Sequence, residues 1–158
     1  MDLKDSFVVT ASEREIMLST AHRCQNCRYF RDRNWTIVNV TGREPHKTPT
    51  GLKVLDFPLK VGKEWDQRLA LRSIRDGQET LYFNQFKVEA YEEVTVKAGT
   101  FKAFRVSWLQ TPAGSRSKGR AEYWWSPEVR GFIKRVVHTP EYWSYQLSDF
   151  ELESYTIK

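Results

Sequence analysis

The chain has 158 residues, of which 40% are hydrophobic and 14% aromatic, and this predicts a single domain, residues 1–158, with a substantial packed core. No stretch approaches the roughly 18 consecutive apolar residues that a membrane-spanning helix requires, so no membrane span is expected. The net charge of +5 arises from 25 basic and 20 acidic residues spread along the sequence, which argues against a dense basic tail that binds nucleic acid.

The first third of the chain contains the sharpest chemical motif. Its opening residues, MDLKDSFVV, include no apolar signal-peptide segment. Cys24 and Cys27 then form a Cys-x-x-Cys pair, preceded by His22. Such a pair can bind zinc, cycle as a redox dithiol or form a small disulfide. Zinc normally needs four ligands and a second cysteine pair is absent, so plain thiols or a structural bridge are favoured, with a zinc or redox site as the alternative.

Apolar and polar residues alternate with a period of two through most of the chain, which is typical of β-strands. The clearest runs are Trp35–Val40, Glu79–Lys97 and Phe104–Trp108. Turn signals separate them at short intervals: Asp76-Gly77, Ala98-Gly99, the loop 111–119, Ser126-Pro127 and Thr139-Pro140. This pattern predicts an all-β, largely antiparallel domain, built as a curved sheet, a sandwich or a half-open barrel.

The stretch AEYWWSPEVRGFIKR, residues 121–135, is expected to form a β-hairpin. Its strand places Tyr123 on one face with Trp125, and Glu122 on the other face with Trp124. Interleaved aromatic and basic residues also occur in single-strand nucleic-acid binders, but an acidic neighbour disfavours phosphate, so nucleic acid is an unlikely partner. The predicted contacts with a ligand or partner are Trp124, Arg130 and Trp143.

Catalytic motifs are missing from the sequence, which contains no Gly-x-Ser-x-Gly elbow, no His-Glu-x-x-His and no glycine-rich phosphate loop. Glu92 and Glu93 are adjacent, and on a strand their side chains point to opposite faces. His46 and His138 have the character of surface residues. An enzyme is therefore not indicated.

Three stretches together resemble an uncharacterised family of bacterial cell-envelope β-domains. They are FPLKVGKEW at residues 57–65, EVTVKAGTF at 93–101 and YWWSPEVRG at 123–131, and the family pattern reads PLKVGKxW, VTVxAGTF and YWYSPxVG. The resemblance implies a β-domain in a periplasmic protein or lipoprotein and implies no reaction. This chain departs from the pattern by placing Arg130 before Gly131, which adds a charge at the turn.

These observations favour a non-catalytic binding or assembly module of the bacterial cell envelope that holds a partner protein or an apolar ligand on a sheet face. The expected location is the periplasm or envelope, with a signal or anchor outside this sequence, and the cytoplasm is the alternative. The competing hypotheses are a zinc- or redox-active protein using Cys24 and Cys27, and a single-stranded nucleic-acid binder. No cofactor is expected apart from zinc at that cysteine pair.

Overall fold

The computed structural model describes residues 52–72, 76–143 and 149–155, together with the backbone of four strands nearer the N-terminus. Those strands are β1 (Phe7–Val8), β2 (Glu15–Leu18), β3 (Arg28–Arg31) and β4 (Thr36–Thr41). With β5 (Leu52–Lys53) they form an antiparallel sheet in chain order. The strand predicted at Trp35–Val40 is thus confirmed as β4, shifted by one residue.

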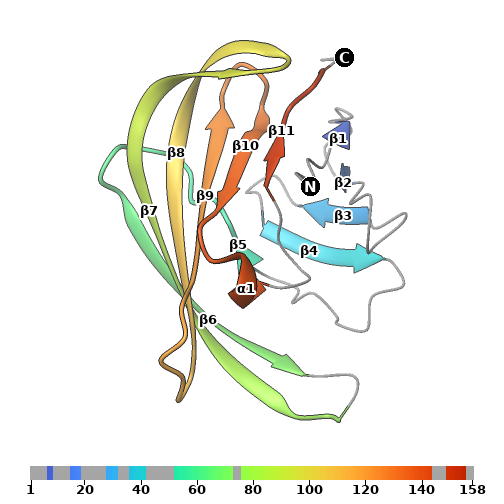
Figure 1. Ribbon diagram of the computed structural model, residues 1–158, viewed down its shortest axis with the longest axis vertical. Coiled ribbons are helices and arrows are strands. Elements are labelled where there is room, and N and C mark those ends of the chain that lie inside the picture. Colours follow the sequence, from blue (N-terminus) through green and yellow to red (C-terminus); the bar gives the residue numbers. More distant parts are fainter. Residues whose placement is uncertain are drawn as a thin grey trace.

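The second sheet is a six-stranded antiparallel meander in which each strand pairs with its neighbours in the chain (Figure 1). It is open, with β6 and β11 at its two ends, so the all-β prediction is confirmed in its curved-sheet form. A single helical turn, α1 (Pro140–Trp143), precedes β11 and was not predicted. The strands are β6 (Glu64–Arg72), β7 (Glu79–Val96), β8 (Gly99–Pro112), β9 (Gly119–Ser126), β10 (Gly131–Val137) and β11 (Phe150–Glu151).

Most connections follow the predicted turn signals. A two-residue turn, Lys97-Ala98, joins β7 to β8, and Gly99 adopts a φ of 137° that favours glycine. The Asp76-Gly77 prediction is correct in place but wrong in length, because Arg72 pairs with Glu79 and six residues, not two, separate them in the sequence.

One extra residue in β7 divides the sheet into two halves. Val88 pairs with Val106 and Ala90 pairs with Arg105, so Glu89 is left over as a β-bulge. We call face A the face that carries Val88 and Val106, and face B the opposite face, which carries Arg105. The lower half in Figure 1 lies on the β6 side of the bulge, and the upper half leads to the β7–β8 turn. Because the bulge reverses the alternation in β7, Val88 faces side A whereas Ala90 faces side B.

The lower half buries face A beneath Leu52, Val54 and Leu55. A row of aromatic rings crosses this face, one from each of five strands, with successive centroids 5.3, 5.6, 5.9 and 5.2 Å apart. Each such ring pair contributes about 0.5–1.5 kcal/mol beyond its buried area. The row consists of Trp65, Phe86, Trp108, Tyr123 and Phe132.

The upper half buries face B instead. Its cluster contains Val94, Phe101 and Trp124, and the C-terminal segment covers it with Phe150 and Leu152. The amide of Ala98 donates to the carbonyl of Leu152 across 3.0 Å, which ties the hairpin turn to that segment. The two hydrophobic clusters therefore lie on opposite faces of one sheet.

The FPLKVGKEW stretch has a structural role. Nζ of Lys63 donates to the carbonyl oxygens of Asp56 at 2.6 Å and Pro58 at 3.0 Å, closing the segment into a loop. Gly62 has a φ of 87°, which explains the glycine at this turn. Nε1 of Trp65 then donates to the carbonyl of Lys53 across 3.1 Å, and this bond fixes the start of β6.

Candidate functional site

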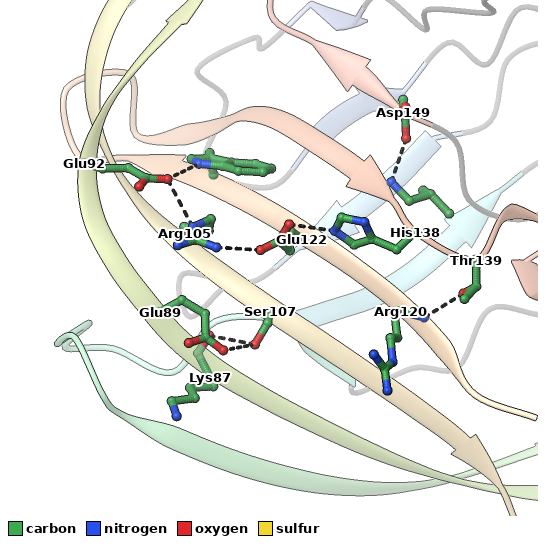
Figure 2. Close-up of polar contacts among 12 residues, drawn as sticks. Lys87, Glu89, Glu92, Arg105, Ser107, Arg120, Glu122, His138, Thr139 and Asp149 are labelled. Carbon is green, nitrogen blue, oxygen red and sulfur yellow. Dashed lines mark hydrogen bonds and ion pairs between the residues drawn. The ribbon is translucent and has the colours of Figure 1, made fainter.

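The candidate site is a line of charged residues that crosses face B at the boundary between the two halves. Its members are Glu92 on β7, Arg105 on β8, Glu122 on β9 and His138 just beyond β10. Figure 2 shows the four side chains reaching toward one another across the strands. We call these four residues the polar strip.

Arg105 is the centre of the polar strip. Its Nη1 donates to Oε1 of Glu122 across 2.8 Å, and its Nε lies 3.1 Å from Oε1 of Glu92. The hydrogen bond to Glu122 raises the pKa of Arg105, since it outweighs the opposing effect of partial burial. The guanidinium is therefore anchored by one hydrogen bond to β9 and one ion pair to β7, and its Nε makes no hydrogen bond of its own.

Glu122 accepts a second hydrogen bond on its other oxygen. Nε2 of His138 lies 2.6 Å from Oε2 of Glu122, and the glutamate side chain is largely covered. Burial alone raises the pKa of Glu122, but the hydrogen bonds from Arg105 and His138 together outweigh it, so the pKa lies below its ordinary value. Glu122 is thus a carboxylate at neutral pH, with both oxygens engaged.

Trp124 closes the upper end of the polar strip. Its Nε1 donates to Oε1 of Glu92 across 2.8 Å, and Nζ of Lys134 lies 5.1 Å from the centre of its ring. Only 8% of Trp124 is exposed. The sequence predicts Trp124 as a contact residue, but face B is buried in the upper half, so this side chain faces the core and not solvent. Its ring packs in the core and offers a partner little surface.

The polar strip has the arrangement of a structural ion-pair network. Nε2 of His138 is directed at Glu122, and the Ser107 hydroxyl donates to Oε1 of Glu89 across 2.8 Å. The serine and the histidine are therefore each engaged with a carboxylate and are not paired as a nucleophile with its base. Among the residues that the structure describes, no group of three or more His, Cys, Asp or Glu side chains could hold a metal ion.

Apolar side chains lie exposed on face B below the polar strip. Leu81 and Phe83, both on β7, are each 37% exposed. The guanidinium of Arg68 on β6 lies 5.6 Å from the centre of the Phe83 ring. We call Arg68, Leu81 and Phe83 the apolar patch. It lies in the half of the sheet where face A is the buried face, so face B is left to solvent.

The other predicted site residues lie away from the polar strip. Arg130 is exposed in the β9–β10 turn and has a φ of 55°, unusual for a residue with a side chain. Trp143 belongs to α1, but its side chain is outside the described part of the chain. His22, Cys24 and Cys27 also lie outside the described residues, so the zinc, redox and disulfide alternatives stay predictions.

Sequence reasoning missed the polar strip. Glu92 was noted only beside Glu93, and His138 only as a surface residue. Arg105 and Glu122 lie 17 positions apart and meet because β8 and β9 pair side by side. The sequence feature that indicates this contact is the hairpin loop 111–119, because its position determines which residues of β8 and β9 lie opposite each other.

Comparison of the chain with protein-family models, with curated proteins and with solved structures returned no match. Among the described residues, no helix is long and apolar enough to cross a membrane.

Proposed function

We propose that this protein is a non-catalytic binding module that holds a partner protein on face B of the lower half of its sheet. The carrying observation is the exposed apolar patch, which lies on the same face as the polar strip and in a sheet half whose other face is the buried one. Protein interfaces typically combine an apolar centre that includes aromatic and arginine side chains with a polar rim. The patch supplies such a centre, and the strip supplies a rim.

The rigidity of the polar strip supports this proposal. Each of its charges already has a partner within the protein, so binding would cost little side-chain entropy there. The envelope compartment rests on the sequence resemblance and is part of the same proposal. The alternative occupant of the apolar patch is an apolar ligand, because exposed leucine and phenylalanine side chains can bind any apolar surface.

The charges around the patch support a protein partner over a nucleic acid. Glu64, Asp66 and Glu89 are exposed on or beside the lower half of face B, among Arg68 and Lys87. A phosphate backbone laid across this face would meet carboxylates as often as cations, and the charge-neutralising contacts that dominate nucleic-acid affinity would be lost.

The test is site-specific photocrosslinking in cells that produce the protein, with a benzophenone amino acid in place of Phe83. The matched control carries the same group in place of Glu128, which is exposed in the β9–β10 turn. We expect a discrete crosslinked protein from position 83 and not from position 128, and its loss on Leu81→Glu. A small mass increase at position 83 would identify an apolar ligand instead. Equal labelling at both positions, or none at either, would refute the proposal.

A further inference from the structure

The upper half of β7 has no neighbour on its outer side among the strands that the structure describes. β7 has 18 residues, and β6 pairs only with Glu79–Lys87. The last bonds on that side join the amide of Gly62 to the carbonyl of Val88 (2.8 Å) and the amide of Val88 to the carbonyl of Lys63 (2.9 Å). Figure 1 shows the chain turning away there, and β7 continuing upward as the outermost strand.

The pairing pattern identifies which backbone groups point outward. The two-residue turn makes Val96 and Gly99 the closing hydrogen-bonded pair, so the amide and carbonyl of Val96 point toward β8. These directions alternate along an antiparallel strand, so both groups of Tyr91, Glu93 and Thr95 point away from β8. Val88, on the other side of the bulge, also points outward, as its bonds to Gly62 and Lys63 require.

The side chains along this edge are accessible from face A. Tyr91, Glu93 and Thr95 are all exposed, Tyr91 by 47%. Val61, in the turn where β6 departs, is 51% exposed. An incoming strand would therefore find apolar surface at Tyr91 and Val61 and a carboxylate at Glu93. The other edge strand, β6, differs because it already bonds to another segment of the chain. The Gln67 side chain hydrogen-bonds to both the amide and the carbonyl of Lys53.

The charges along this edge indicate whether its partner strand comes from a second copy of this chain or from a different protein. The segment Glu89–Val96 contains three glutamates and neither lysine nor arginine. Antiparallel pairing of two copies about Glu93 places the two Glu93 side chains opposite each other, and pairing about Tyr91 places Glu93 opposite Glu89. Like charges directly opposite are destabilising. Pairing about Thr95 would use Lys97, which lies in the turn and bonds Glu153 across 2.5 Å.

We propose that the edge Glu89–Val96 of β7 adds a strand from a different protein, one in which a basic residue faces Glu93 and apolar residues lie close by. Main-chain hydrogen bonds to Tyr91, Glu93 and Thr95 would supply the affinity, and the side chains of face A would supply the selectivity. This edge lies in the opposite half of the sheet from the apolar patch, so it stands or falls separately from the binding face proposed above.

The experiment uses amide NMR of the full chain with a short peptide of alternating lysine and valine as the probe. We expect the amides of Tyr91, Glu93 and Thr95 to exchange rapidly in the free protein, and to shift and become protected when the peptide is added. A peptide of alternating glutamate and valine is the control and should leave them unchanged. Glu93→Lys should weaken lysine-peptide binding about fivefold, which is the effect of reversing one cross-strand charge pair, while Glu128→Lys should not change it.

Three results would overturn the inference. Slow exchange of these three amides in dilute free protein would mean that the edge is already paired. Protection that rises with protein concentration without any peptide would identify a second copy as the occupant. Peptide-induced shifts elsewhere than the Glu89–Val96 edge would place the binding site on another surface.

Discussion

The two halves of the six-stranded sheet use the same strands to opposite effect. Below the bulge, Phe86 and Val106 pack on face A, whereas above it Val94 and Phe101 pack on face B. The exposed surface changes sides at the same place, so the apolar patch lies on face B and the exposed Tyr91 on face A. Strand β8 makes this change through its own sequence, since it buries Phe101 and Ala103 above and Val106 and Trp108 below, and the extra residue Glu89 lets β7 follow the change.

The largest effect is expected in the lower core. Phe86→Ala removes a ring that is 2% exposed and lies between Trp65 and Trp108, and the free energy of unfolding should fall by about 4 kcal/mol. Urea denaturation followed by circular dichroism measures this change. Glu89→Ala keeps the bulge and loses only the exposed bond to Ser107, so it should cost less than about 1 kcal/mol. Equal stability of the Phe86→Ala and Glu89→Ala variants would show that face A does not form the core of the lower half.

Trp124 and Trp125 are neighbours in β9, but the first packs in the upper cluster and the second against the lower cluster. Trp124→Phe removes a hydrogen bond to the carboxylate of Glu92 and should lower the free energy of unfolding by about 2 kcal/mol. Nε1 of Trp125 is buried on face A without a hydrogen-bond partner, so Trp125→Phe loses ring volume but no hydrogen bond and should cost about 1 kcal/mol. Thermal unfolding of the two variants compares them directly. A larger loss of stability for Trp125→Phe than for Trp124→Phe would contradict the view that only Trp124 contributes a stabilising hydrogen bond.

The polar strip, at the boundary between the halves, should make stability depend on pH. The pKa of Glu122 is lower in the folded protein than in the unfolded chain, so its contribution is full above the unfolded value and disappears as the pH falls through the folded value. Glu122→Gln should therefore destabilise by about 1.5 kcal/mol at pH 7, and the difference from the parent should shrink once the pH falls below the unfolded glutamate value of about 4.3 and vanish below the folded value. A difference that is constant from pH 7 to pH 3 would exclude this explanation. Glu93→Gln, on the exposed edge, is the matched control.

The smallest effect is expected at the upper end, in the β9–β10 turn. Arg130 has a φ of 55°, where glycine has no steric penalty. Arg130→Gly should raise the free energy of unfolding by about 1 kcal/mol, because relief of the backbone conformation exceeds the entropy cost of glycine. Glu128→Gly in the same turn is the control and should not stabilise. A loss of stability in Arg130→Gly would mean that the arginine side chain contributes more than its backbone costs.

The strands and turns could be predicted because their signals are local. Alternation placed β7 and β8, and the loop 111–119 placed the ends of β8 and β9. The change of buried face could not be predicted, because Glu89 is an ordinary polar residue in an alternating run, and its effect depends on the register against Arg105. Alternation within β9 likewise places Trp124 on the face opposite Tyr123, but it cannot reveal that Phe150 and Leu152, from the far end of the chain, cover that face.

The meander order of the strands has a kinetic consequence. Each strand of the sheet bonds only to strands adjacent in the chain, and the longest hairpin, β7–β8, closes through a turn of two residues. Closing so short a loop costs little entropy, so we expect this hairpin to nucleate folding, with β6 and β9 added on either side. The lower core can then form from consecutive segments. The upper core must wait for Phe150 and Leu152, so its completion should be the last step of folding.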